Sequence, residues 1–76
     1  MGTAELASAV SNAGGLGILG AGNAPADWLR SQIRRTKEMT YRPFGVNIML
    51  MSPFAQEVVE VVLEERVPLV TTGAGN

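Results

Sequence analysis

The chain has 76 residues, which allow one small domain and exclude two, since domains usually hold roughly 100 to 150 residues. Six lysines and arginines against seven acidic residues leave a net charge of −1, a field too weak to indicate binding to nucleic acid or to a membrane. Cysteine and histidine are absent, which excludes disulfides, thiolate metal sites and Ser-His-Asp catalysis, so any chemistry must come from a cofactor or from residues outside the chain.

The first half of the chain predicts a helix, a strand and a second helix. A competent N-cap and helical spacing of apolar residues predict the first helix over about Thr3 to Ala13, and Gly14 suits the left-handed residue that ends many helices. The apolar residues at helical spacing are Leu6, Ala9, Val10 and Ala13. A short apolar run between glycines predicts a strand at Leu16 to Leu19, and Pro25 opens a helix over roughly Ala26 to Met39.

The second half repeats this alternation. The nearly continuous apolar run from Phe44 to Leu50 is typical of a parallel strand covered by helices on its faces. Ser52 and Pro53 predict the N-cap and the first turn of a third helix. The helical stripe of this third helix is Phe54, Val58, Val61, Val62 and Glu65. Val67 to Thr72 is rich in β-branched residues and predicts a last strand.

The predicted order of helices and strands indicates right-handed crossover units and a parallel sheet, so the fold class is α/β. Three strands leave both edges of such a sheet unpaired. The sequence also opens on a helix with no strand before it and closes on a glycine-rich turn where another helix would begin. We therefore expect residues 1–76 to be part of a larger domain.

Two glycine motifs lie near the first strand. Gly15 to Gly20 matches the pattern G-x-G-x-x-G, but within the predicted strand instead of after it, which favours close packing of a helix over a dinucleotide site. Gly20 to Asn23 leaves the carboxyl end of the strand and precedes a helix, where free backbone N–H groups favour a phosphate. This turn is either a ligand contact or an ordinary connection.

Asn47 is the most informative single residue, since a buried carboxamide without partners costs on the order of a few kcal/mol. It is either a core asparagine bonded to neighbouring backbone or a ligand-binding carboxamide near the carboxyl end of a strand. Thr71 to Asn76 forms a third strand-end loop of small residues and hydroxyls. Parallel strands with right-handed crossovers place all three loops at the same face, where barrel enzymes bind their ligands.

Charged residues gather on two of the predicted helices. Those on the second helix predict a solvated face, with docking of an acidic carrier protein as the alternative: Arg30, Arg34, Arg35 and Lys37. Those on the third helix predict another solvated face and no metal site: Glu57, Glu60, Glu64 and Glu65. No run approaches the roughly 20 apolar residues of a membrane span and no signal peptide opens the sequence, so we expect a cytoplasmic protein.

Three blocks of the sequence resemble a known family. They run from Thr3 to Gly17, from Pro43 to Asn47 and from Val70 to Asn76. They are similar, in the same order, to the FMN-dependent enoyl-acyl-carrier-protein reductases of the nitronate monooxygenase superfamily. That family is a flavin-bearing (β/α)8 barrel in which NAD(P)H reduces FMN and the reduced flavin passes hydride to an enoyl thioester. The resemblance implies that residues 1–76 are an N-terminal part of such a TIM barrel, with roughly three of its eight units and without the first strand.

The resemblance also implies which residues bind the cofactor. Asn47 matches the asparagine expected to hydrogen-bond the flavin, and Thr72 with Gly73 matches the strand-end segment that lines the same cavity. Gly20 and Gly22 match the turn beside the flavin. The resemblance implies no catalytic residue and no metal ligand in this chain, because the histidine of the family and its phosphate-binding loops belong to later segments.

The implied co-substrate is NAD(P)H, and the implied partner is an enoyl substrate carried on acyl carrier protein, with no nucleic acid and no membrane. A homodimer is a candidate assembly. We expect the 76 residues alone to be inactive. Two alternatives stay open: a nitronate monooxygenase of the same superfamily, and a small non-catalytic α/β module that binds a nucleotide or a partner through its sheet edge.

Overall fold

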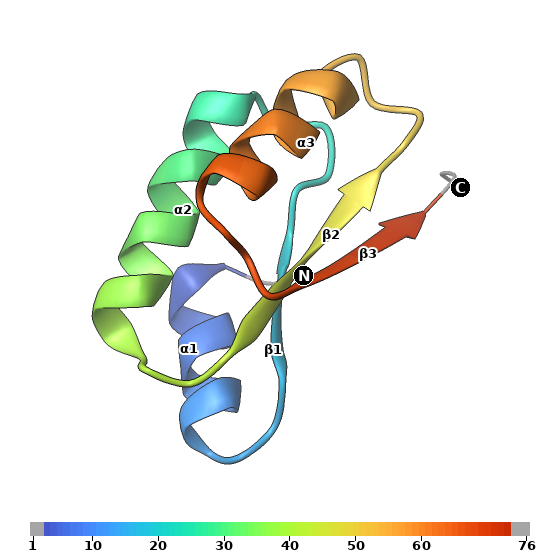
Figure 1. Ribbon diagram of the computed structural model, residues 1–76. Coiled ribbons are helices and arrows are strands. Elements are labelled where there is room, and N and C mark those ends of the chain that lie inside the picture. Colours follow the sequence, from blue (N-terminus) through green and yellow to red (C-terminus); the bar gives the residue numbers. More distant parts are fainter. Residues whose placement is uncertain (1–2, 74–76) are drawn as a thin grey trace.

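A computed structural model describes residues 3–73 of the chain. Helices and strands alternate as predicted: α1 (Ala4–Asn12), β1 (Gly17–Gly20), α2 (Ala26–Met39), β2 (Phe44–Met49), α3 (Ala55–Glu64) and β3 (Leu69–Gly73). The strands form one parallel sheet in the order β1-β2-β3, with β2 in the centre (Figure 1). The predicted α/β class and the parallel pairing are therefore confirmed.

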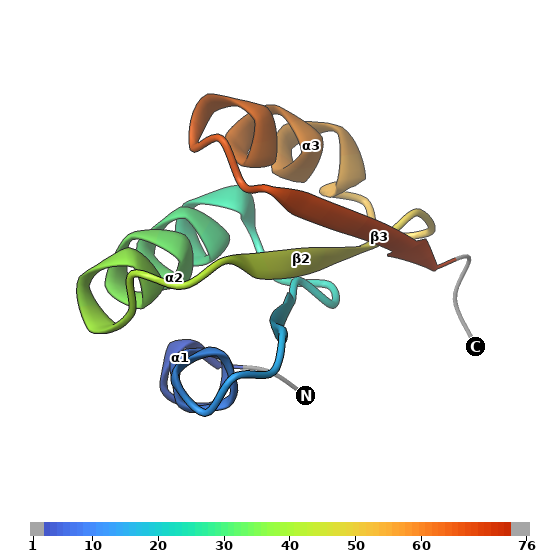
Figure 2. The same ribbon diagram turned by 60° about the horizontal axis from the view of Figure 1, so that its bottom comes forward.

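All three helices lie on the same side of the strands, as both views show (Figure 1, Figure 2). This arrangement follows from the strand order. When each parallel strand is added beside the previous one by a right-handed crossover, every connecting helix lies on the same face of the sheet. When the strand order reverses direction, helices lie on both faces. The described residues thus form consecutive βα units of the (β/α)8 type, as the resemblance implies.

The hydrophobic core lies between the sheet and the helices. Leu19, Val46 and Ile48 point from the strands into this layer and are at most 2% exposed. They meet Leu29 and Ile33 of α2, and α3 adds Val58, Val61 and Val62. The alternate strand residues face the other way, and their burial ranges from the buried Gly45 to the exposed Leu69 and Thr71. Within residues 3–73, the expectation that helices cover the faces of the Phe44–Leu50 strand therefore holds for one face of β2.

The α1 helix packs against β1 through small residues, not through the apolar stripe expected from the sequence. All four residues of that stripe are exposed. The buried residues are instead Ala4, Ala7, Ser8 and Ser11. The reason is a close approach at Gly17, where a Cβ atom would lie 2.6 Å from the carbonyl carbon of Ala7. Larger side chains would hold the helix away from the strand, so the packing interpretation of the G-x-G-x-x-G motif is confirmed at Gly17.

Ser11 joins α1 to the segments that begin both neighbouring strands. Its hydroxyl donates to the Pro43 carbonyl oxygen at 3.0 Å and accepts from the Gly17 N–H at 3.0 Å, and the residue is fully buried. A buried polar group without a partner costs about 1 to 3 kcal/mol, so Ser11→Ala should lower the free energy of unfolding by about 2 kcal/mol. Urea unfolding measures the loss. The control Ser31→Ala removes an exposed hydroxyl and should change the value by less than about 0.5 kcal/mol.

The predicted helix ends agree with the structure in two cases and differ in one. The α2 helix has the predicted bounds, and α1 ends at Asn12, shortly before Gly14, whose φ of 98° is left-handed as expected. The α3 helix begins at Ala55, because the Ser52 hydroxyl accepts from the Phe54 N–H at 3.1 Å in a turn that precedes the helix. The interpretation of Ser52 and Pro53 as the N-cap and first turn is therefore wrong. No helix within residues 3–73 combines the length and the apolar character that crossing a membrane requires.

Arg66 follows α3 in a left-handed backbone conformation, with a φ of 56°. Its N–H donates to Leu63 and the Val67 N–H donates to Val62, both at 3.2 Å, a pattern that favours glycine at this position. Arg66→Gly should therefore raise the free energy of unfolding by about 1 kcal/mol. Arg66→Ala removes the same side chain without adding conformational freedom. In a urea titration, this control should not raise the free energy of unfolding. An equal increase in both variants would contradict the explanation.

Candidate functional site

The carboxyl ends of the three strands meet at one edge of the sheet (Figure 1). The register places Gly20 of β1, Asn47 of β2 and Thr71 of β3 side by side. The turns after β1 and β2 leave from this edge, and β3 ends at it. The predicted gathering of the strand-end loops is thus confirmed for the described residues, and Ala74 to Asn76 of the third loop lie outside them.

Asn47 is half-buried at the centre of this row. Its Oδ1 accepts a hydrogen bond from the Thr71 hydroxyl at 2.8 Å, and its backbone oxygen accepts from the Ala21 N–H at 3.1 Å. The carboxamide lies on the face away from the helices, and its Nδ2 meets no hydrogen-bond partner among residues 3–73. For the side chain, the interpretation as a core asparagine bonded to backbone is therefore wrong.

The two threonines of β3 face opposite ways. Thr72 pairs with Ile48, a core residue, so its side chain lies on the helix side of the sheet, away from Asn47. Only the backbone of Thr72 is left to border the cavity that the resemblance implies. Thr71 is the residue that sequence reasoning missed. Residues two apart in a strand lie on the same face of the sheet. Because the resemblance places Gly73 beside the cavity, Thr71 is the threonine expected to share that face, and Thr72 is not.

The turn after β1 brings Gly20 and Gly22 to the same edge. Gly20 is the partner of Asn47 in the sheet. Gly22 has a φ of 53°, and a Cβ atom there would meet no atom within 4 Å, so the glycine serves the conformation of the turn and not its packing. The Ala24 N–H donates to the Ala21 carbonyl oxygen at 3.0 Å and closes the turn. The backbone of this turn is therefore held beside Asn47 by the bond from Ala21.

An apolar row lies next to the polar row, on the same face of the sheet. Ile18, Gly45 and Leu69 form it across the three strands. A Cβ atom at Gly45 would lie 2.9 Å from the Ile18 Cδ1 and 3.2 Å from the Leu69 Cβ, so the two flanking side chains cover the glycine. On the other side of the polar row, Met49 of β2 pairs with Gly73 of β3 on the same face of the sheet. The polar row thus lies between two apolar surfaces.

This arrangement can bind and orient a ligand, but it cannot transfer a proton. Gly20, Asn47 and Thr71 carry no group that ionises near neutral pH. In the part of the chain that the structure describes, no three acidic side chains gather to hold a metal ion. A flat group with acceptor atoms along its edge suits an apolar surface with one free carboxamide donor. The isoalloxazine ring of FMN has this shape and these acceptors, so the residues fit the cofactor that the resemblance implies.

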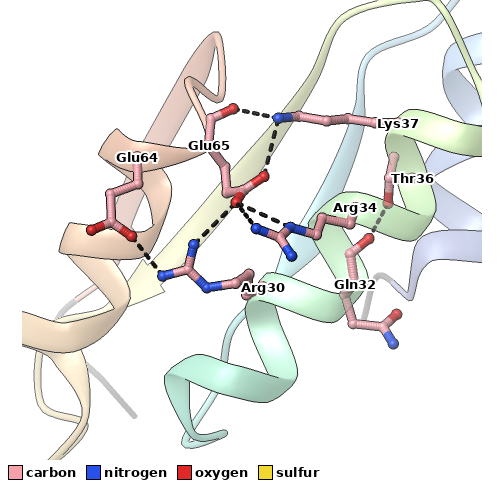
Figure 3. Close-up of polar contacts among 7 residues, drawn as sticks. All are labelled: Arg30, Gln32, Arg34, Thr36, Lys37, Glu64 and Glu65. Carbon is pink, nitrogen blue, oxygen red and sulfur yellow. Dashed lines mark hydrogen bonds and ion pairs between the residues drawn. The ribbon is translucent and has the colours of Figure 1, made fainter.

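The strongest cluster of charges lies elsewhere, between α2 and α3 (Figure 3). The Glu65 side chain is 10% exposed and contacts Arg30 at 3.1 Å, Arg34 at 3.2 Å and Lys37 at 3.2 Å. Arg30 also contacts Glu64 at 2.6 Å. The predicted solvated face is therefore wrong for Glu65, which is buried, whereas Arg34, Lys37 and Glu64 are exposed as predicted although they join the two helices. Because α3 ends at this cluster and β3 begins shortly after it, the cluster lies at the opposite end of the sheet from Asn47.

The pKa of Glu65 lies below its usual value of 4.5. Burial raises this pKa, but hydrogen bonds from Lys37 and Arg34, together with their charges, lower it further than burial raises it. The fourth basic residue of α2, Arg35, contacts Glu5 at 2.5 Å. Each of the four basic residues thus has an acidic partner within the chain, which argues against the alternative that this face docks an acidic carrier protein.

Comparison of the sequence with known proteins gives one family and several relatives. The chain matches the family described as nitronate monooxygenase over residues 1–74. It is 49% identical over 51 residues to the nitronate monooxygenase of Paraburkholderia phytofirmans. The aligned segment covers 67% of this chain and 14% of the relative. It is 44% identical over 64 residues to the (3aS,4S,5R,7aS)-5-hydroxy-7a-methyl-1-oxo-octahydro-1H-indene-4-carboxyl-CoA dehydrogenase of Mycobacterium tuberculosis. This alignment covers 84% of this chain and 18% of the relative.

Solved structures agree with this family. FabK from Thermotoga maritima superposes with a TM-score of 0.94 at 56% identity, covering 99% of this chain and 24% of that protein. The nitroalkane oxidase of Streptomyces ansochromogenes superposes with a TM-score of 0.86 at 28% identity, covering 92% of this chain and 29% of the oxidase. The chain spans less than a third of each of these proteins. The superfamily indicated by the three sequence blocks is confirmed, and the chain belongs to the nitronate monooxygenase family.

Proposed function

We propose that this chain forms part of the FMN cavity of an oxidoreductase that reduces enoyl-acyl carrier protein with NAD(P)H in fatty acid biosynthesis. The observation that carries the proposal is the row of Gly20, Asn47 and Thr71 at the carboxyl edge of the sheet. The row offers hydrogen bonds beside apolar surface and contains no ionisable group. Such a surface suits a cofactor that brings its own chemistry, and FMN supplies hydride transfer when it is bound.

Each residue of the proposed cavity has a binding role and none has a catalytic one. Asn47 would donate to an acceptor on the flavin from its free Nδ2. Gly20 and Gly22 would leave the backbone of the first turn open to the cofactor, while Thr72 and Gly73 would border it through the main chain of β3. We expect the 76 residues alone to be inactive, because the site has no group that donates a proton.

Similarity within the family supports the reductase over the monooxygenase. The FabK structures share 55% and 56% identity with this chain over 97% and 99% of its length, against 28% for the nitroalkane oxidase. The blocks 3–17, 43–47 and 70–76 are also those that resemble the reductases. Nitronate monooxygenase is the second candidate, because the family match and the 49% identity to the Paraburkholderia phytofirmans protein favour it. A homodimer remains the proposed assembly.

The test compares two reactions of the purified full-length protein that carries this sequence. We expect flavin absorbance and NAD(P)H oxidation that depends on a crotonyl thioester. Oxygen uptake with a nitronate, without reduction of the thioester, would support the monooxygenase instead. A flavin-free protein that melts cooperatively would contradict both assignments and support the small non-catalytic module that binds a nucleotide or a partner through its sheet edge.

A further inference from the structure

We propose that Thr71 is a positioning residue that orients the Asn47 carboxamide toward the cofactor. The inference rests on the proposed function, because it assumes that Asn47 contacts FMN. It adds a residue to that contact and states how the residue acts. Thr71 binds the asparagine and not the cofactor, so its effect on the cofactor passes through Asn47.

The hydrogen bond between the two side chains crosses from β3 to β2. Thr71 and Asn47 are direct partners in the parallel register, 24 residues apart in sequence, and their side chains share the face away from the helices. The Thr71 hydroxyl donates to the Asn47 Oδ1 at 2.8 Å. This bond holds the carboxamide oxygen on the β3 side and leaves Nδ2 on the side away from Thr71.

Orientation matters because the two ends of a carboxamide have opposite hydrogen-bonding character. The oxygen accepts and the nitrogen donates, and the terminal torsion of asparagine is broad, so an unrestrained side chain presents either end. A cofactor edge that carries acceptor atoms requires the nitrogen. With Oδ1 occupied by the Thr71 hydroxyl, Nδ2 is the free group, and no residue from 3 to 73 competes for it.

The backbone of Asn47 is fixed as well as its side chain. Its carbonyl oxygen accepts from the Ala21 N–H at 3.1 Å, and β2 is hydrogen-bonded to β1 on one side and β3 on the other. The central strand therefore holds the Cα position, while Thr71 restrains the torsions of the side chain. Such preorganisation reduces the entropy lost when the ligand binds.

A purely structural role makes a different prediction. A cross-strand hydrogen bond near the surface stabilises a sheet weakly, so a structural Thr71 would alter unfolding slightly and leave cofactor affinity unchanged. A positioning Thr71 would alter cofactor affinity and leave unfolding nearly unchanged. Because Thr71 is exposed and valine suits a strand, Thr71→Val separates the two cases without loss of the fold.

The experiment measures the affinity of the full-length protein for FMN by quenching of flavin fluorescence. Thr71→Val should weaken binding by about fivefold to tenfold, the loss expected for one hydrogen bond, with an unchanged urea midpoint. Thr71→Ser keeps the hydroxyl and should restore the affinity of the parent. The matched control Val70→Thr changes the neighbouring residue on the opposite face of β3 and should bind FMN as the parent does.

A double variant tests the route through Asn47. In an Asn47→Ala background, Thr71→Val should cause no further loss of FMN affinity, since the side chain that it orients is gone. Parental affinity in Thr71→Val, or an equal loss in both backgrounds, would overturn the positioning role while leaving the proposed function intact. A parent protein that binds no FMN would overturn the proposed function and this inference with it.

Discussion

A Gly17→Ala variant is expected to lose roughly 3 kcal/mol of its free energy of unfolding. The added Cβ would lie 2.6 Å from the carbonyl carbon and 2.8 Å from the Cα of Ala7, and backbone atoms of a helix cannot rotate aside. Relief of the overlap requires α1 to move away from β1, which opens the core around Leu19. Urea unfolding followed by the fluorescence of Trp28, the single tryptophan of these 76 residues, measures the loss.

Gly22→Ala is the matched control, because it adds the same methyl group at a glycine with open space around it. Its left-handed φ of 53° still disfavours alanine, so a loss of about 1 kcal/mol is expected. If Gly17→Ala proved no less stable than Gly22→Ala, the close packing of α1 on β1 would be refuted.

A Glu65→Gln variant is expected to lose about 2 kcal/mol of its free energy of unfolding. The carboxylate lies within 3.2 Å of basic groups of Arg30, Arg34 and Lys37, and its removal leaves three positive charges close together. The partners are 30% to 64% exposed, so water screens each pair and keeps the loss below that of a fully buried ion pair. Urea unfolding at low and high salt measures the effect, which should shrink as salt rises.

Glu60→Gln serves as the control for this variant, since Glu60 is exposed on the same helix and the described residues give it no ion pair. It should change the free energy of unfolding by less than about 0.5 kcal/mol. Equal losses from the two variants would mean that overall charge, and not the contacts of Glu65, stabilises the fold.

The same carboxylate predicts a dependence of stability on pH. The pKa of Glu65 is below 4.5 in the folded chain, so the unfolded chain binds the proton more readily as the pH falls. The contribution of the cluster is therefore complete above about pH 4.5 and is lost as the pH falls through the lower pKa of the folded state. The difference in stability between the parent and Glu65→Gln should shrink as the pH is lowered from about 7 to about 3, and a constant difference would contradict this assignment.

The sequence was sufficient for features that depend on local periodicity. The bounds of α2 follow from Pro25 and from the spacing of Leu29 and Ile33, and the parallel sheet follows from the alternation of elements. The gathering of Gly20 and Asn47 at one edge then follows from topology alone, because parallel strands end on the same side.

Features that depend on contacts between distant segments were predicted incorrectly or missed. The buried face of α1 is set by Gly17 on another element, so the helical spacing of Leu6 and Val10 indicated the wrong face. The partner of Asn47 depends on the register of β3, which one residue of slip would reverse from Thr71 to Thr72. The ion pairs of Glu65 depend on how α2 and α3 pack, and composition cannot distinguish them from solvated charges.

Gly45 has a consequence for the shape of the sheet. The central strand carries no side chain at this position, and Ile18 and Leu69 lean over it from both neighbours. Because the central strand has no side chain here, the outer strands can approach one another on this face without steric overlap. The sheet therefore bends toward this face. The concave side is then the side of Asn47 and Thr71, so their polar atoms converge on a common point. One absent side chain thereby favours the curvature by which strands roll into a closed cylinder.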